Sequence, residues 1–137
     1  MDKSVNPEIW GPHGWKFLHY VSMGYPNNPS YEDKNNYKNF YYSLQTVLPC
    51  GKCAMNYKQN LTKLPIDNHL ENRDSLVKWV IDIHNLVNDE IGKDKIEYEK
   101  ALSLYTSGNN DYKSLDYCFK LAVLIIILYF LYLILKK

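Results

Sequence analysis

Two cysteines separated by two residues are the strongest chemical signal in this sequence. They lie in Cys50-Gly51-Lys52-Cys53, directly after Pro49. Two thiols at this spacing at the start of a helix can close a disulfide, and the positive end of the helix dipole stabilises a thiolate on the first of them. Lys52 adds a positive charge close by. The segment therefore predicts a redox-active pair that exchanges electrons with other thiols.

The same two cysteines could instead have a structural role. A structural zinc site needs four ligands, and neither the third cysteine, Cys118, nor His69 and His84 have the spacing that would complete one. A thioredoxin-type motif would require a βαβ unit, which the sequence does not predict. The two cysteines could also be ordinary buried residues without a redox role.

A second polar group lies in the otherwise apolar segment from Trp79 to Asn88. His84, Asn85 and Asn88 are close enough in sequence to share one side of a helix, and Lys93 follows about one turn later. Three polar side chains beside an apolar stripe are costly unless something binds them. We interpret them as the site of a polar ligand wedged into a helical bundle, although a single histidine there is more often a satisfied core residue.

A third group lies near the N-terminus and combines two indoles, two imidazoles and two glycines: Trp10, Gly11, His13, Gly14, Trp15 and His19. Flat rings can stack against a flat cofactor, and glycines permit close approach of the backbone. An aromatic core accounts for the same residues equally well.

Helices must position all three groups. The sequence predicts four of them and a short fifth, over residues 7–23, 31–47, 50–61, 74–91 and 98–105. Phe17 and Val47 are expected on apolar faces of the first two. In the fourth, apolar residues recur every three or four positions up to Ile91, and Gly92 is typical of a helix end. Because no segment alternates as a strand does, we expect an all-α fold, a four-helix bundle with a short fifth helix.

The C-terminal residues predict a membrane anchor. The run from Leu121 to Leu135 is apolar apart from two tyrosines; extended back to Tyr117 it makes a helix of roughly 28 Å, close to the ~30 Å hydrocarbon core of a bilayer. A buried core helix is the alternative, but such a helix usually has a polar face. We expect a domain over 1–109, a linker over 110–116 and a single-pass transmembrane helix over 117–137.

Charge and cysteine content exclude several classes of protein. Sixteen Lys and Arg against 15 Asp and Glu give a formal charge of +1, so no field favours nucleic acid. Three cysteines are too few for the disulfide framework of a small secreted protein. The first residues lack the apolar core of a signal peptide, so the N-terminal domain is expected in the cytosol.

Taken in order, the three groups resemble the Erv/ALR family of FAD-dependent sulfhydryl oxidases. The resemblance covers roughly residues 7–105 and is carried by Trp10-Gly11-x-x-x-Trp15-x-Phe17-Leu18-His19, the pair Cys50 and Cys53, Trp79-x-x-x-x-His84-Asn85-x-Val87-Asn88, and Ile91-Gly92-Lys93. The short length and the ending Tyr98-x-x-Ala101-x-x-x-Tyr105 are most similar to compact members encoded by large DNA viruses that replicate in the cytoplasm.

The resemblance implies a helical bundle, usually dimeric, that binds FAD and no metal. Electrons would pass from a protein dithiol to the cysteine pair, then to the flavin and to oxygen, giving a disulfide and hydrogen peroxide. Cys53 would be the flavin-proximal cysteine and Cys50 the one that exchanges with substrate. The positions that match flavin contacts are Gly11, Gly14, Trp15, His19, Cys53, His84, Asn85, Asn88 and Lys93.

The sequence departs from the family in ways that bear on its partners. Pro12 stands where the family often has Arg, and there is no second CxxC pair to act as a shuttle. We therefore expect direct transfer from a separate dithiol carrier, such as a thioredoxin-like protein, at a virion or host membrane. Cys118 would link two subunits, accept a lipid or be inert. The alternative function is a tail-anchored helical adaptor without enzymatic activity, in which the cysteines are structural.

Overall fold

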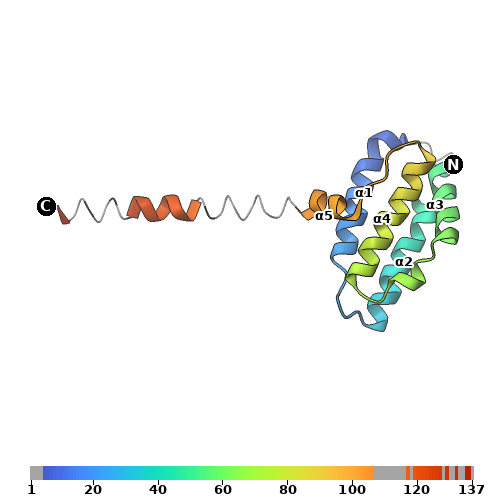
Figure 1. The fold of residues 1–137 in the computed structure, drawn as a ribbon, viewed down its shortest axis with the longest axis horizontal. Helices are drawn as coiled ribbons and strands as arrows, with labels where there is room; N and C mark the ends of the chain where they lie inside the picture. Colours follow the sequence, from blue (N-terminus) through green and yellow to red (C-terminus); the bar gives the residue numbers. More distant parts are fainter. Residues whose placement is uncertain are drawn as a thin grey trace. The chain divides into compact units, whose positions relative to one another are not determined.

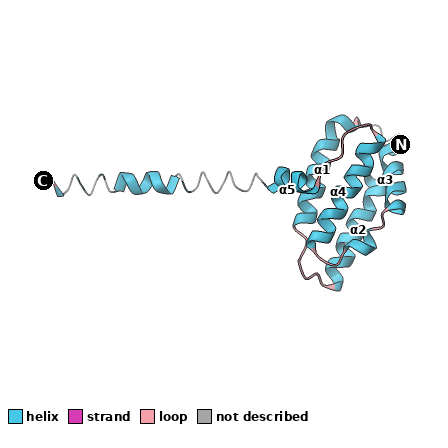
Figure 2. Ribbon diagram, in the orientation of Figure 1, coloured by secondary structure: helices cyan, strands magenta, loops and turns pink. Residues whose placement is uncertain are grey.

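The described part of the chain is helical. The computed structural model describes residues 5–106, 117, 119–127, 129, 132, 135 and 136. The helices are α1 (Pro7–Met23), α2 (Tyr31–Val47), α3 (Gly51–Lys63), the 3-10 turn η1 (Ile66–His69), α4 (Arg73–Glu90) and α5 (Tyr98–Thr106) (Figures 1 and 2). No β-strand occurs in this part of the chain, so the all-α prediction is confirmed. The chain divides into two units, Met1–Ala101 and Leu102–Lys137.

The helices α1 to α4 each begin at a residue whose side chain accepts a backbone N–H of the first turn: Asn6, Ser30, Cys50 and Asn72. At the start of α2 the Asp33 carboxylate also accepts the backbone N–H of Ser30, which completes a capping box. The helices begin and end within a few residues of the predicted positions. Two details differ: Cys50 caps α3 rather than opening it, and the short turn η1 lies between the third and fourth predicted helices.

In the first unit, α1 packs mainly against α4, and α2 packs against α3 (Figure 1). At the C-terminal end of α1, Arg73 Nε donates to the backbone oxygen of Tyr25 at 2.6 Å, which ties that end to the start of α4. At its N-terminal end, the backbone N–H of Val5 donates to the oxygen of Pro49 at 3.1 Å. The start of α1 therefore lies beside the start of α3, where the cysteines are.

The core of this unit is built from large side chains with their polar atoms satisfied. Its most buried members include Tyr41, Ile66, Leu76, Trp79, Val80 and Ile83. The indole N–H of Trp79 donates to the oxygen of Leu64 at 3.0 Å, and the Tyr41 hydroxyl donates to the oxygen of Leu18 at 2.9 Å. Such bonds remove the penalty of burying an N–H or O–H group, so these aromatic residues can fill the interior.

Three residues predicted on apolar helix faces are exposed instead. Phe17, Val47 and Ile91 keep 58%, 60% and 57% of their surface accessible. Phe17 faces outward because Leu18 and His19 occupy the buried side of α1, whereas the other two lie at or just beyond a helix end, where neighbouring helices no longer cover them.

In the second unit, the described residues from Tyr117 to Ile127 are helical and exposed. Among all described residues, none belongs to a helix both long and apolar enough to cross a bilayer. The transmembrane helix predicted over 117–137 is therefore not found in this part of the chain. The predicted linker, 110–116, and Cys118 lie outside the described residues.

Candidate active site

The two predicted redox cysteines are joined by a disulfide at the start of α3, with their Cα atoms 5.1 Å apart. Cys50 has an extended backbone and caps the helix, and the backbone N–H of Cys53 donates to its Sγ at 3.1 Å. Both cysteines are half-buried, Lys52 is exposed, and the first turn has no acidic residue. When the disulfide opens, the helix N-terminus and Lys52 therefore both stabilise a thiolate on Cys50.

A cluster of flat rings joins α1 to α4. Nε2 of His19 and Nδ1 of His84 are 3.0 Å apart, which makes a buried hydrogen bond between residues 65 apart in sequence. The Trp15 ring stacks on His84, with centroids 4.1 Å apart and planes within 9° of parallel. The structure thus brings together three predicted site residues from two separate sequence segments. We name this set, Trp15, His19 and His84, the ring cluster.

Both imidazoles of the ring cluster are neutral at physiological pH. Burial, together with the charge of His84, lowers the pKa of His19 to about 3. Burial, together with the Lys93 ammonium, lowers the pKa of His84 to about 4. Their shared hydrogen bond requires the same of at least one of the two rings, because one of the facing nitrogens must lack a proton to accept. The cluster therefore offers a neutral, polar and aromatic surface.

The two predicted asparagines of α4 have partners within the protein. The Asn85 amide bonds both the N–H and the oxygen of Ile96, at 2.8 and 2.9 Å. Asn88 Nδ2 donates more weakly to the oxygen of Asp94, at 3.3 Å. Sequence reasoning placed His84, Asn85 and Asn88 on one side of a helix around a ligand. In the structure His84 lies against α1, and the two asparagines form hydrogen bonds with the segment that follows α4.

The two predicted glycines differ in their surroundings. A Cβ on Gly14 would lie 3.2 Å from the Trp10 ring, so the missing side chain lets that indole approach the α1 backbone. A Cβ on Gly11 would meet nothing within 4 Å. Only Gly11 therefore leaves open space of the kind that the prediction of close cofactor approach requires.

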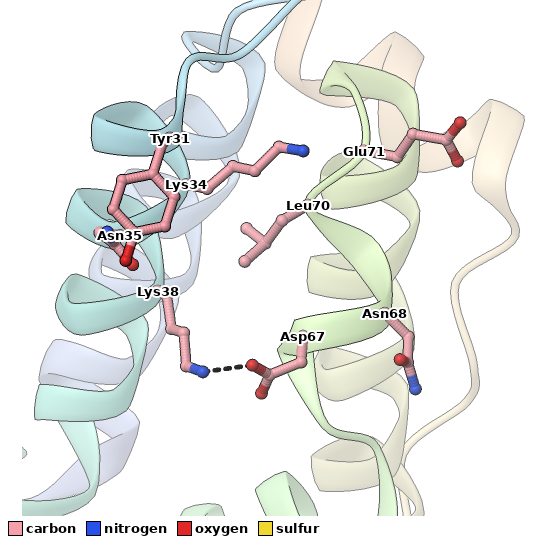
Figure 3. Close-up of a pocket in the computed structure, with 8 residues that line it drawn as sticks. All are labelled: Tyr31, Lys34, Asn35, Lys38, Asp67, Asn68, Leu70 and Glu71. Atoms are coloured by element: carbon pink, nitrogen blue, oxygen red, sulfur yellow. Dashed lines mark hydrogen bonds and ion pairs between the residues drawn. The ribbon is translucent and has the colours of Figure 1, made fainter.

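A cavity of about 320 Å³ lies between α2 and η1 (Figure 3) and contains none of the predicted site residues. Asp67 on one wall pairs with Lys38 on the other and accepts a hydrogen bond from Tyr42, so both its oxygens are engaged. Across the described residues, no three potential His, Cys, Asp or Glu ligands gather around a metal position.

Sequence reasoning missed the partners of α4. Ile96 receives the Asn85 amide through its backbone, and the Tyr98 hydroxyl donates to Asp74 at the other end of the same helix. A backbone partner leaves no trace in residue type, because any residue carries the same N–H and C=O groups. The helix-ending Gly92 was the one feature of the sequence that could have indicated these partners, since a chain that reverses direction there runs back along the helix.

Comparison with known proteins agrees with this arrangement. The family model described as "Erv1 / Alr family" matches residues 12–106. A probable FAD-linked sulfhydryl oxidase of Acanthamoeba polyphaga mimivirus is 50% identical over 99 residues, which span 72% of this chain and 69% of the viral protein. The mitochondrial FAD-linked sulfhydryl oxidase erv1 of Schizosaccharomyces pombe is 31% identical over 83 residues, 61% of this chain and 46% of that protein.

Solved structures with the same helical arrangement include the yeast Erv1 core, with a TM-score of 0.70 and 26% identity over 77% of this chain and 87% of that one. The FAD-binding domain of Erv1 from Saccharomyces cerevisiae has a TM-score of 0.66 and 27% identity, covering 70% of this chain and 90% of that one. On the family match over most of the described helices, this chain is a member of the Erv1/Alr family of FAD-linked sulfhydryl oxidases.

Proposed function

We propose that this protein is a flavin-dependent thiol oxidase that forms disulfides in protein substrates and reduces oxygen to hydrogen peroxide. The observation that carries the proposal is the Cys50–Cys53 disulfide, which caps α3 in a chain of the sulfhydryl oxidase family. A disulfide at a helix N-terminus is a good electron acceptor because the dipole stabilises the thiolate released when it opens.

The exchange begins when a substrate thiolate attacks Sγ of Cys50. The Cys50–Cys53 bond breaks, and Cys53 leaves as a thiolate. A second substrate thiolate then attacks the substrate sulfur of the mixed disulfide, so the substrate departs as a disulfide and Cys50 as a thiolate. The substrate has lost two electrons and two protons, and the cysteine pair has gained them. Cys50 is assigned the exchange because its released thiolate is held by the N–H of Cys53.

The residues of the α1–α4 contact fit an FAD cofactor. The ring cluster supplies flat surfaces and neutral imidazoles, Lys93 supplies a cation beside His84, and Gly11 leaves open space. That donor set suits a flat heteroaromatic ring joined to a diphosphate. When bound, FAD accepts the electrons of the reduced cysteine pair and passes them to oxygen. Gly14, Asn85 and Asn88 would support this site through their packing and their hydrogen bonds.

The function is tested on the full chain purified in detergent. We expect a yellow protein, with flavin bound in a near-stoichiometric amount, that consumes oxygen in the presence of dithiothreitol. The double variant Cys50→Ser/Cys53→Ser should stay yellow and consume no oxygen above the buffer rate. A colourless wild-type protein, or full turnover by the double variant, would refute the proposal and favour the adaptor function.

We also propose that two copies associate through the outer face of α1. Ile9, Phe17 and Tyr20 lie within about one quarter-turn of one another on that helix and keep 69%, 58% and 43% of their surface exposed. Three large apolar side chains on one exposed face are typical of an interaction surface. Light scattering should give the mass of a dimer, and Phe17→Asp should shift it toward the monomer.

The C-terminal segment, 117–137, is proposed as a membrane anchor for a domain that faces the cytosol. The support is the run from Leu121 to Leu135, which carries no charge and is apolar apart from two tyrosines. The full chain expressed with membranes should resist extraction at alkaline pH, while protease added from the cytosolic side should digest the N-terminal domain. Release at alkaline pH would overturn the anchor, and protection from protease would overturn the orientation. The dithiol partner is proposed to be a separate thioredoxin-like carrier.

A further inference from the structure

After α4 the chain reverses and runs back along the same helix. Gly92 has a positive φ of 71°, its N–H donates to the oxygen of Asp89, and the N–H of Lys93 donates to the oxygen of Asn88 at 2.9 Å. This pair of bonds is a Schellman motif, in which a left-handed glycine ends the helix. Residues 93–97, which we name the return segment, have no regular secondary structure before α5 begins.

Asn85 makes the most complete side-chain contact between α4 and the return segment. Its Oδ1 accepts the N–H of Ile96 at 2.8 Å, and its Nδ2 donates to the oxygen of Ile96 at 2.9 Å. A side-chain amide carries both an acceptor and a donor, so Asn85 pairs with both backbone groups of Ile96, as a neighbouring strand would. Asn85 therefore fixes both the position and the orientation of Ile96.

The other contacts of the return segment are weaker. Asn88 makes one long hydrogen bond to Asp94, and Lys95 forms an ion pair with Asp89 at 2.8 Å in which both side chains are more than half exposed. Exposed ion pairs contribute little because water competes for both charges. Between the Gly92 turn and α5, Asn85 is thus the main contact that keeps the return segment on the helix.

The return segment begins with Lys93, whose N–H donates to the oxygen of Asn88, one turn of α4 after His84, at 2.9 Å. The charge of Lys93 also lowers the pKa of His84 in the ring cluster. Lys93 lies between two fixed points, the Gly92 turn and the clamped Ile96. If Ile96 is released, only one of those points still restrains the lysine. The placement of its ammonium near His84 therefore depends on Asn85, the residue that directly follows His84 in α4.

We propose that Asn85 is a positioning residue: by clamping Ile96 it holds Lys93 beside the ring cluster, and it does not itself bind the cofactor. This inference rests on the proposed FAD site and changes the role that the sequence suggested for Asn85. One N–H and the carbonyl oxygen of its amide are engaged by Ile96, so in this proposal its effect on FAD passes through Lys93.

The test compares full-length wild type with Asn85→Ala, Lys93→Ala, the double variant and the control Lys95→Ala, which changes only the exposed ion pair. Hydrogen exchange reports the clamp, and flavin fluorescence reports FAD affinity. We expect Asn85→Ala to speed exchange of the Ile96 amide about tenfold while core amides of α4 are unchanged. Asn85→Ala and Lys93→Ala should each weaken FAD binding about tenfold, and the double variant also about tenfold. The control Lys95→Ala should change neither the exchange of the Ile96 amide nor FAD binding by more than about twofold.

Because Asn85 and Lys93 act as a unit in this proposal, the double variant is decisive. A loss in the double variant equal to the product of the single losses would mean that Asn85 contacts FAD independently, and the proposal would fail. Unchanged exchange at Ile96 would also overturn it. A wild-type chain that binds no FAD would refute the proposed function and the role of Lys93, while the exchange measurement would still decide whether Asn85 clamps Ile96. Asn85→Asp, which keeps only the acceptor, should give intermediate exchange.

Discussion

The start of α3 and the middle of α4 both carry residues that the sequence marks as chemical, but they are built in different ways. Cys50 and Cys53 are three residues apart and meet within a single helical turn. His84 meets a histidine 65 residues away, and Asn85 meets a backbone 11 residues away. The α3 site is thus local, whereas the α4 site exists only when the bundle has formed.

This difference predicts how each region responds to mutation. At the start of α3 the reactive groups are half-buried and contribute little to the core, so activity can be lost while the fold persists. Along α4 the same helix that carries His84 and Asn85 also carries Leu76 and Trp79, which are fully buried. Mutations there should therefore change stability and the site together.

The largest expected effect is on activity at the α3 site. Cys53→Ser should lower dithiothreitol-dependent oxygen consumption at least about a thousandfold, because the pair can then no longer be oxidised. The free energy of unfolding should fall by no more than about 2 kcal/mol, since the disulfide closes a very short loop. Oxygen electrode and urea unfolding measurements on the same preparation check both. Cys118→Ser is the control and should keep both values; equal activity in Cys53→Ser would contradict a local redox site.

The next effect is on stability along α4. Leu76→Ala removes a fully buried side chain and should lower the free energy of unfolding by about 3 kcal/mol, through lost burial and the cavity left behind. Urea unfolding followed by circular dichroism measures it. Ile91→Ala, at an exposed position after the same helix, should change stability by less than about 0.5 kcal/mol. If both variants were equally stable, α4 would not couple the site to the core.

The same distinction explains what the sequence could and could not predict. Helix positions followed from apolar periodicity and from local stop signals such as Gly92, and the structure adds caps such as Ser30 and Asn72, which act over one turn. The cysteine pair could be predicted equally well, because the two residues that form the disulfide lie in the same short motif. The pairing of His19 with His84 required the packing of α1 on α4, and the exposure of Phe17 required knowing which side of α1 that packing buries. Neither is determined by local spacing.

The neutral histidines make the stability of the bundle depend on pH. The folded pKa values of His19 and His84, about 3 and about 4, lie below the ordinary value of 6.5. Below pH 6.5 the unfolded chain therefore binds protons that the folded chain does not, and acidification favours unfolding. We expect the free energy of unfolding to fall between pH 6.5 and 4.5 by up to about 1.4 kcal/mol per pH unit for each histidine.

Urea unfolding at a series of pH values between 7.5 and 4.5 measures how the free energy of unfolding changes with pH and so tests this prediction. The depressed carboxylates, including Asp33 and Asp67, have unfolded pKa values near 3.8, so their contribution is lost mainly below this window. His84→Asn should reduce the slope by about half, because one of the two buried imidazoles is gone. An unchanged slope in that variant would show that the ring cluster is not the source of the pH dependence.

The smallest effect concerns the cap of α3 and separates its structural role from its redox role. Cys50→Ser and Cys50→Ala should both abolish thiol oxidation. Because both variants lack the Cys50–Cys53 disulfide, the difference between their stabilities does not contain the contribution of that disulfide. A serine hydroxyl can accept the Cys53 N–H that Cys50 Sγ accepts now, and alanine cannot. We expect Cys50→Ser to be more stable by about 1 kcal/mol in urea unfolding. Equal stabilities would mean that the bond between Val5 and Pro49, rather than the cap, holds the start of α3. In that case the site of the cysteine pair would depend on distant parts of the chain, as the α4 site does.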